Sequence, residues 1–204
     1  VLRLNTEGRG KYLGSFKADD KILTLMKDGY YRLTNFELTN HFDEDLILIE
    51  KFNPKKIVSV VYFDGETKLP YIKRFQIEES DKKLNFIGDH SDSYVYAISN
   101  DWLPQVEVVY NEKLNKKKIE NEKILLADFI AVKGYKAKGK RVSTHFVKEV
   151  LLLDSLPYEE EGEIVNEEDF EEESTENDIS TPLELDNNKK SDEDGDDPIQ
   201  MTLF

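Results

Sequence analysis

Short runs rich in Val, Ile, Tyr, Phe and Thr alternate with polar turn dipeptides between about residue 20 and residue 154. The first two runs, residues 22–26 and 30–34, are separated by Asp28-Gly29, and residues 57–63 and 71–77 follow the same plan around Asp64-Gly65. Runs of β-branched and aromatic residues that meet at an Asp-Gly pair are typical of antiparallel hairpins. The hydrophobic pattern therefore predicts an all-β fold.

The turn dipeptides recur at a nearly constant spacing. Asp28-Gly29, Asp64-Gly65, Asn100-Asp101 and Lys133-Gly134 are separated by 36, 36 and 33 residues. A period near 35 with several short strands per unit is typical of the blades of a propeller-like array, and we expect three to four blades in this chain. Residues 112–122 have some helical periodicity, but they are too charged on all sides to hold an apolar face, and we predict a loop there.

The charge of the chain is divided unevenly along its length. Residues 1–150 hold 26 Lys and Arg against 23 Asp and Glu, whereas residues 151–204 hold 2 against 20, so the net charge of −15 arises in the last quarter. A segment this acidic cannot bury enough apolar surface to offset the entropy lost on ordering. We therefore predict a folded domain over residues 1–156 and a disordered acidic tail over residues 157–204 that ends in a short apolar peptide.

Several functional classes are disfavoured by what the sequence lacks. The absence of Cys excludes a disulfide scaffold, a thiolate metal site and a cysteine nucleophile. No apolar run or export signal indicates a membrane, and we expect a cytoplasmic protein. His41, His90 and His145 have no metal-ligand spacing, so we expect neither a metal site nor catalytic residues. Because the sequence begins with Val1 inside an expected strand, we also expect a fragment of a longer protein.

Two stretches resemble a known family. Residues 20–30 (DKILTLMKDGY) and 129–141 (FIAVKGYKAKGKR) resemble the blade motifs in the A subunits of bacterial type IIA topoisomerases, DNA gyrase and topoisomerase IV. The second stretch is the more specific and is similar to topoisomerase IV A subunits of Bacteroidetes-type bacteria. The chain lacks the Gln-Arg-Arg-Gly-Gly-Lys-Gly box of gyrases, and residues 8–11 (GRGK) resemble only part of it. This favours topoisomerase IV and leaves gyrase open.

The resemblance implies a β-pinwheel, a propeller-like disc of four-stranded antiparallel blades whose basic rim binds and bends duplex DNA. The rim would present DNA to the catalytic core for ATP-dependent strand passage, in relaxation or decatenation. The cleaving tyrosine, the Mg²⁺ site and the ATPase would lie in other parts of the enzyme, so the chain itself would hold no cofactor. The implied partners are duplex DNA, the B subunit of topoisomerase IV, and another copy of the A subunit, contacted through the missing N-terminal part, in a nucleoid-associated enzyme.

Clustered cations are the candidates for contact with DNA. The densest cluster comprises Lys133, Lys136, Lys138, Lys140 and Arg141. On an extended strand the lysines at 136, 138 and 140 would share one face at a spacing of roughly 6.5–7 Å, which suits contacts with successive phosphates. Gly134 and Gly139 would leave room for the duplex. The alternative is a solvated strand face.

Further cations stand at corresponding or neighbouring places. Arg32, Lys73 and Arg74 occupy equivalent positions in other expected repeats, and Lys116, Lys117 and Lys118 form a second cluster that is equally consistent with a solubilising turn. Lysine contacts with phosphates position DNA without reading its sequence, so we expect sequence-independent binding that is selective for DNA geometry.

The tail suggests two further roles. Its acidity is consistent with a solubilising segment or with a DNA mimic that competes for the basic rim. The terminal residues Gln200, Met201, Thr202, Leu203 and Phe204 resemble the peptide that docks bacterial proteins on the replication sliding clamp, and the alternative is that Leu203 and Phe204 pack against the body. A propeller-like module that binds basic proteins or the clamp, without binding DNA, is therefore the alternative function.

Overall fold

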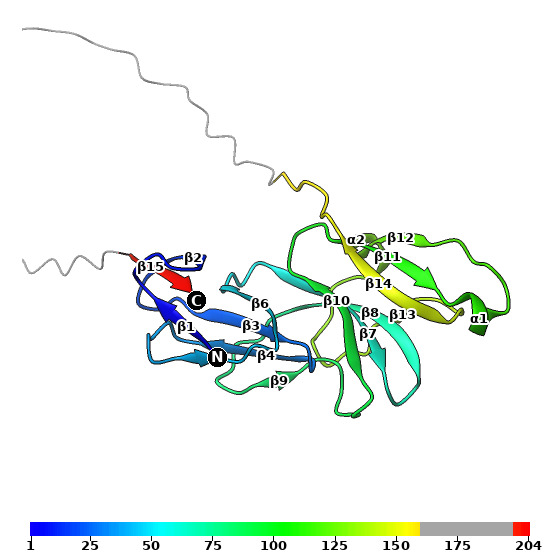
Figure 1. Cartoon of the computed structure of the whole chain (residues 1–204), viewed down its shortest axis with the longest axis horizontal. Coiled ribbons are helices and arrows are strands. Elements are labelled where there is room, and N and C mark those ends of the chain that lie inside the picture. Colours follow the sequence, from blue (N-terminus) through cyan, green and yellow to red (C-terminus); the bar gives the residue numbers. More distant parts are fainter. Residues whose placement is uncertain (160–197) are drawn as a thin grey trace, which may run out of the picture. The chain divides into compact units, whose positions relative to one another are not determined.

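Four antiparallel sheets account for nearly all the regular structure of the computed structural model, which describes residues 1–159 and 198–204 (Figure 1). The first sheet has the strand order β2 (Lys11–Phe16), β15 (Ile199–Leu203), β1 (Leu2–Asn5), β5 (His41–Phe42). The second has the order β6 (Leu46–Lys51), β3 (Ile22–Met26), β4 (Tyr30–Thr34), β9 (Leu84–Asn85). The third has the order β10 (Tyr94–Ser99), β7 (Ile57–Asp64), β8 (Leu69–Gln76), β13 (Lys140–Arg141). The fourth has the order β12 (Glu122–Leu125), β11 (Gln105–Tyr110), β14 (Val147–Leu153).

The sheets are interlocked because three of them take an edge strand from a later part of the chain. The edge strand β5 of the first sheet follows β4 of the second, β9 of the second follows β8 of the third, and β13 of the third follows β12 of the fourth. Along the chain, each of the first three sheets therefore receives an edge strand only after strands of the next sheet. The all-β prediction is confirmed by this arrangement.

Hydrophobic clusters fill the spaces between successive sheets. The cluster between the second and third sheets includes Leu25, Tyr31 and Phe75. Neighbouring residues of strand β7 pack into two different clusters. Val60 belongs to the cluster between the second and third sheets, and Val61 belongs to the cluster between the third and fourth sheets. Successive side chains of a strand point to opposite faces, so a strand covered on both sides has a continuous apolar run. This explains why residues 57–63 are apolar on both faces of the strand, with Ser59 as the one polar residue in the run.

The expected repeat is correct for two of its four turns. Asp28-Gly29 and Asp64-Gly65 lie in the β3–β4 and β7–β8 hairpins, as predicted. Asn100-Asp101 instead connects the third sheet to the fourth, and Lys133-Gly134 precedes β13 without closing a hairpin. The corresponding hairpin of the fourth sheet joins β11 to β12. Turn dipeptides mark changes of chain direction and do not distinguish hairpins from connections between sheets.

The predicted loop at residues 112–122 contains one short helix and ends in a strand. The single-turn helix α1 (Glu112–Asn115) begins at Asn111, whose side chain accepts a hydrogen bond from the Leu114 amide, and ends at Lys116 in a left-handed conformation. A second single-turn helix, α2 (Leu126–Phe129), follows β12 directly. Short polar caps stabilise such single turns without any apolar face.

The folded part reaches beyond the predicted boundary at residue 156. The amide of Leu156 donates to the carbonyl of Leu103 at 2.9 Å, and the ring of Tyr158 stacks on Trp102 with a centroid distance of 5.0 Å. Most of the predicted acidic tail, residues 160–197, lies outside the described residues.

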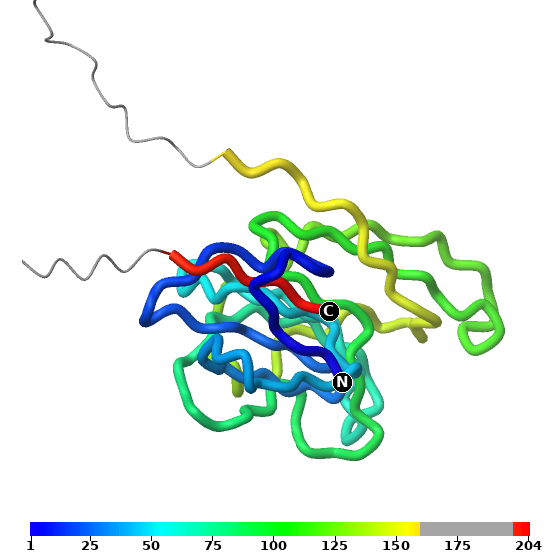
Figure 2. The backbone as a smooth tube through the Cα atoms, turned by 60° about the vertical axis from the view of Figure 1, so that its left-hand side comes forward, coloured from blue at the N-terminus to red at the C-terminus, as the bar shows by residue number. Residues whose placement is uncertain are grey.

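The terminal peptide is a strand of the first sheet. Strand β15 lies between β1 and β2, with Leu203 opposite both Leu4 and Lys11, and Figure 2 shows the C-terminal segment running beside the N-terminal strands. The side chains of Met201 and Leu203 are buried there. The expectation of an exposed peptide at the end of a tether is therefore wrong, because these apolar side chains fill the core of the first sheet.

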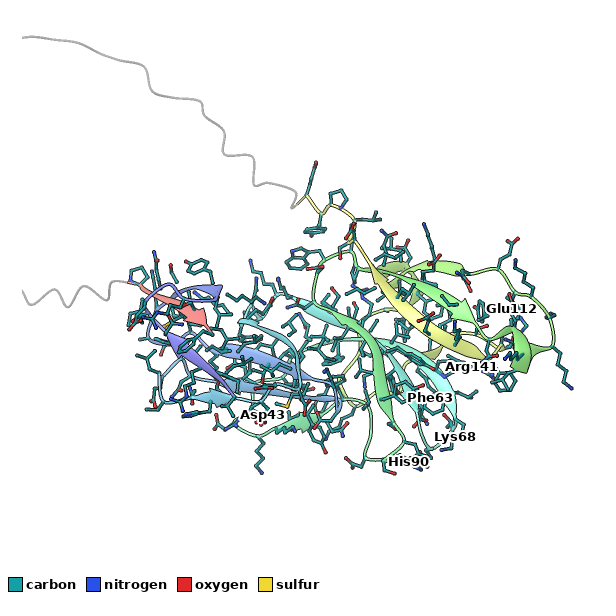
Figure 3. The ribbon with its side chains drawn as sticks, viewed as in Figure 1. Asp43, Phe63, Lys68, His90, Glu112 and Arg141 are labelled. Carbon is teal, nitrogen blue, oxygen red and sulfur yellow. The ribbon has the colours of Figure 1, made fainter. Side chains whose placement is uncertain are left out.

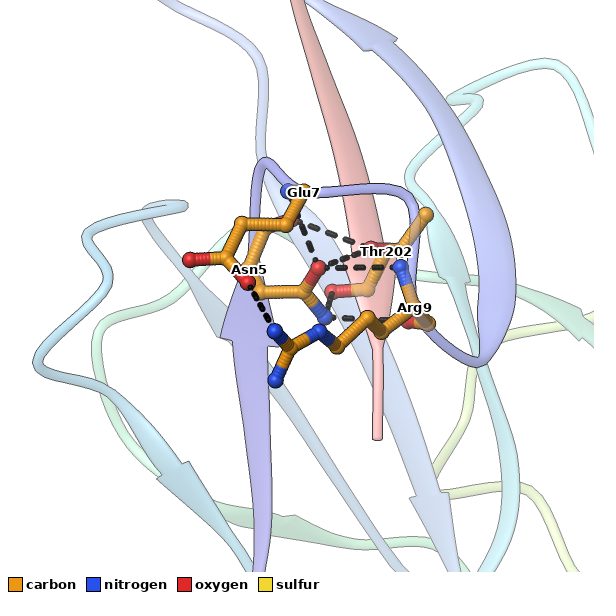
Figure 4. A network of polar contacts seen from close by, with 4 residues as sticks. All are labelled: Asn5, Glu7, Arg9 and Thr202. Carbon is orange, nitrogen blue, oxygen red and sulfur yellow. Dashed lines mark hydrogen bonds and ion pairs between the residues drawn. The ribbon is translucent and has the colours of Figure 1, made fainter.

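Polar contacts fix β15 in register. The hydroxyl of Thr202 donates to the side-chain carbonyl of Asn5 at 2.7 Å, and the same Asn5 oxygen accepts hydrogen bonds from the amides of Glu7 and Arg9 (Figure 4). A Cβ atom at Gly10 would lie 1.9 Å from the Leu203 carbonyl oxygen, so the turn after β1 fits against β15 only with glycine. Residues far apart in sequence thus form one closely packed unit.

Candidate nucleic-acid interface

The densest cationic segment, residues 133–141, forms a loop on the third sheet, and we call it the basic loop. It begins with a bridge between Lys133 and Phe75 of β8 and ends in β13, where Lys140 and Arg141 pair with Ile72 and Tyr71. Between these ends the chain turns at Tyr135, and a hydrogen bond joins the Ala137 amide to the Gly134 carbonyl at 3.0 Å.

All the cations of the basic loop are at least partly exposed. They are Lys133, Lys136, Lys138, Lys140 and Arg141. In the view of Figure 3, Arg141 lies between Glu112 of α1 and Phe63 of β7. The expectation of an extended strand here is wrong, because only residues 140 and 141 form strand structure. Lys133, Lys136 and Lys138 are therefore exposed outside regular strands, and only Lys140 and Arg141 project from a strand.

The charges of the basic loop are only partly offset by carboxylates. The ammonium of Lys138 lies 2.8 Å from the carboxylate of Asp64. Within residues 1–159 and 198–204, the other four loop cations form no ion pair. The ammonium of Lys140 lies 4.4 Å from the centroid of the Phe129 ring, which orients it without neutralising it. The loop therefore presents positive charge to solvent.

The two glycines of the loop have different roles. A Cβ at Gly134 would meet nothing within 4 Å, whereas a Cβ at Gly139, where φ is +95°, would lie 2.2 Å from the Ile72 carbonyl oxygen. Gly134 has room for a side chain, so the expected close approach of DNA at this residue stays a prediction. At Gly139 the small residue is needed for contact with β8, and not for contact with DNA as expected.

Lys73 and Arg74 do not belong to the exposed surface. Their exposed fractions are 4% and 9%. The Lys73 side chain lies beneath the basic loop, and the Arg74 side chain lies against residues 127–130, which precede it. The Lys73 ammonium donates to the carbonyls of Tyr135 and Ala137 at 2.5 and 2.9 Å. The Arg74 guanidinium donates to Ser59 Oγ at 3.2 Å and to the carbonyls of Ala127 and Ile130 at 3.3 and 3.4 Å. Their prediction as DNA contacts is wrong, because both are buried and their donors bind protein oxygens.

Burial and hydrogen bonding shift the pKa values around the loop. Burial lowers the pKa of Lys73 to about 8. Burial acts to raise the pKa of Asp64, but hydrogen bonds from Lys138 and Thr67 outweigh it, and the pKa is lowered. The same contact with Asp64 raises the pKa of Lys138. Asp64 and Lys138 are therefore both ionised near neutral pH and bind each other.

The remaining cation candidates are exposed on other sheets. Arg32 projects from β4 of the second sheet, while Lys116, Lys117 and Lys118 follow α1 in the β11–β12 connection of the fourth. Several other lysines are paired, as Lys83 is with Asp28 at 2.9 Å. The exposed candidates thus lie on three different sheets.

Clusters of metal-ligating side chains are absent from the part of the chain that the structure describes. Among those residues, no group of three or more His, Cys, Asp and Glu side chains is arranged to hold a metal ion. Neither α1 nor α2 has the length or apolar character needed to cross a bilayer. A pocket of about 360 Å³ beside the loop is lined by Lys136 and Lys138 but also by Asp64, Glu66 and Asp89, so its charges offset each other.

The sequence itself contains a signal for the burial of Lys73 and Arg74. Lys73 and Arg74 are adjacent, and adjacent residues of a strand point to opposite faces. Both therefore cannot lie on one exposed rim, and the apolar residues on either side indicate burial. The supporting role of Tyr62, whose hydroxyl donates to the Lys138 carbonyl at 2.7 Å, has no sequence signal.

One family model matches most of the chain, and two known proteins resemble parts of it. The model of the family described as topoisomerase C-terminal domain, Bacteroidota, matches residues 3–154. The A subunit of DNA topoisomerase 4 from Borreliella burgdorferi is 28% identical over 147 residues, which are 69% of this chain and 22% of that protein, so the chain spans about a fifth of this relative. The crystal structure of a C-terminal domain of DNA topoisomerase IV is 14% identical, with a TM-score of 0.45, over 67% of this chain and 48% of that one.

Proposed function

We propose, since this chain belongs to the Bacteroidota family of topoisomerase C-terminal domains, that its folded part binds and bends duplex DNA without reading sequence. In this proposal the chain is the carboxy-terminal domain of the A subunit of a topoisomerase IV, and it orients a duplex for strand passage. The B subunit, the other copy of the A subunit, ATP and Mg²⁺ act through parts of the enzyme outside this chain. The enzyme would work in the cytoplasm, on the nucleoid.

The exposed basic loop carries the proposal. Four exposed cations without a carboxylate partner in the described structure stand within nine residues of chain. Phosphate contacts of this kind release counterions and supply most of the free energy of sequence-independent binding. Lysine and arginine contacts with phosphates fix the position of a duplex without specifying bases, so selectivity would come from DNA bending.

Salt dependence of binding tests the proposal. If the five loop cations neutralise about five phosphates, the logarithm of the association constant should fall against the logarithm of salt concentration with a slope of roughly −4 to −5. The measurement uses the full chain and a plain duplex of mixed sequence. A slope near zero, or no binding at low salt, would refute DNA binding and favour the protein-interaction alternative.

A matched pair of variants locates the site. Replacing Lys136, Lys140 and Arg141 by alanine should weaken binding and reduce the slope by roughly three units. Replacing Lys17, Lys55 and Lys82, which are exposed elsewhere, removes the same charge and should have a much smaller effect. Equal effects of the two triple variants would show that net charge, and not the basic loop, governs binding.

A test of the role of the acidic segment requires a variant that retains strand β15. Removal of residues 157–204 would also remove a central strand of the first sheet. The suitable variant replaces the acidic residues of 160–197 by Ser, Asn and Gln at constant length. We propose that it binds DNA more tightly than the natural chain at low salt, because competing negative charge has been removed.

A further inference from the structure

Buried donors of the third sheet hold the underside of the basic loop. Tyr62 of β7 donates its hydroxyl to the Lys138 carbonyl, and Lys73 of β8 donates to the carbonyls of Tyr135 and Ala137. Both side chains are almost fully buried, with exposed fractions of 2% and 4%. Three carbonyls of the loop backbone are thereby fixed to two central strands.

Burial of the Lys73 ammonium costs free energy, which indicates that the charged group has a role in the fold. Transfer of a charged group from water to an apolar interior is strongly unfavourable unless hydrogen bonds compensate it, and an apolar side chain would fill the same space without this cost. The ammonium lies near the rings of Tyr62 and Phe75, at 5.6 and 5.5 Å from their centroids, and binds loop carbonyls. Lys73 attaches the loop through these hydrogen bonds, which an apolar residue could not form.

The loop needs such attachment because its backbone pairing is concentrated at its ends. The Lys133 bridge and the β13 pairing hold residues 133 and 140–141, while Gly134 and Gly139 border the intervening turn. Fixing several flexible residues when a ligand binds costs conformational entropy, and a site held in its bound shape avoids this cost.

We propose that Tyr62 and Lys73 are positioning residues for DNA binding, which hold the basic loop in one shape so that its exposed cations meet phosphates as a fixed set. Neither side chain contacts DNA. The inference rests on the proposed function, since it assigns the control of affinity to residues beneath the same loop.

A charge-neutral substitution tests the inference. Tyr62→Phe removes one hydroxyl and leaves the ring and every charge in place. Tyr31→Phe is the matched control, because Tyr31 is equally buried and its hydroxyl bonds only the Glu78 backbone, outside the basic loop: it donates to the carbonyl at 3.2 Å and accepts from the amide at 3.3 Å. The substitution keeps the Tyr31 ring, which packs edge-on against Tyr135 of the loop. We expect Tyr62→Phe to weaken duplex binding about two- to tenfold and Tyr31→Phe to leave it within about twofold of the natural chain.

Hydrogen exchange distinguishes loop positioning from general stability. Tyr62→Phe should speed amide exchange in residues 133–139 while the amides of β3 and β6 keep their protection, and Tyr31→Phe should not affect the loop. Equal losses of affinity in the two variants would overturn the inference, because they would reflect stability alone. Unchanged affinity in Tyr62→Phe, with normal binding by the natural chain, would also overturn it and leave the proposed function standing.

A second pair of variants covers the case in which Tyr62→Phe does not fold. Lys73→Met keeps an unbranched apolar stem, and Lys55→Met removes the same charge from an exposed position. We expect at least about a tenfold loss of affinity for Lys73→Met and less than about twofold for Lys55→Met. If the two lose affinity equally, positioning by Lys73 is refuted. If the natural chain itself fails to bind at low salt, the proposed function fails first and the inference with it.

Discussion

Substitution of Gly139 by alanine should loosen the basic loop from the third sheet. The residue has a φ of +95°, and a Cβ there would lie 2.2 Å from the Ile72 carbonyl oxygen and 2.8 Å from Lys73 Cβ. These atoms belong to β8, which is held on both sides by β7 and β13. The strand cannot move away without breaking its pairing, so the loop must move.

The magnitude follows from strain and from the unfolded chain. A non-glycine residue at such a φ costs about 1–3 kcal/mol, and the steric conflict adds to this. Alanine restricts the unfolded chain, which offsets about 0.4–1 kcal/mol. We expect a net loss of about 2 kcal/mol in the free energy of unfolding, together with weaker DNA binding.

The control is Gly134→Ala in the same loop. A Cβ there meets nothing within 4 Å, so we expect no loss of stability and a gain of up to about 1 kcal/mol. Urea unfolding of both full-length variants, followed by circular dichroism, measures the difference. If Gly139→Ala is as stable as the natural chain, or if Gly134→Ala is destabilised equally, the packing of the loop against β8 is not as we describe it.

Three further predictions address other contacts. Thr202→Val removes the hydroxyl that donates to Asn5 and should lower the free energy of unfolding by about 1–2 kcal/mol; an unchanged melting temperature would contradict the role of this contact. The pKa of Lys73, about 8, lies below its usual 10.5, so between these values only the unfolded chain keeps the proton. Stability should therefore rise between about pH 8 and 10.5, by at most about 1.4 kcal/mol per pH unit. This rise should vanish in Lys73→Met in denaturant titrations. The pKa of Asp64 is lowered from 3.8 in the folded chain, so its ionised carboxylate stabilises the fold above pH 3.8. This stabilisation is lost as pH falls through the folded-state pKa, so the stability of Asp64→Asn should depend less steeply on pH in acid. Identical acid-unfolding curves for the variant and the natural chain would refute this.

Local features of the sequence were sufficient for the class of fold and for part of the candidate site. Alternating β-branched and aromatic residues define strands, and Asp28-Gly29 and Asp64-Gly65 define hairpins, because these preferences act between near neighbours. The exposure of Lys136 and Lys140 was also expected from their charge.

Only the tertiary structure decided which cations face solvent and which are buried. Lys73 and Arg74 carry the same charge as the exposed cations of the basic loop. Their buried donors bind carbonyl oxygens more than 50 residues away in the chain. The place of β15 is determined in the same way, since Thr202 meets Asn5 across a separation of 197 residues. A local pattern specifies that a segment is a strand, but its pairing partner depends on which distant edges and apolar faces the folded chain brings together.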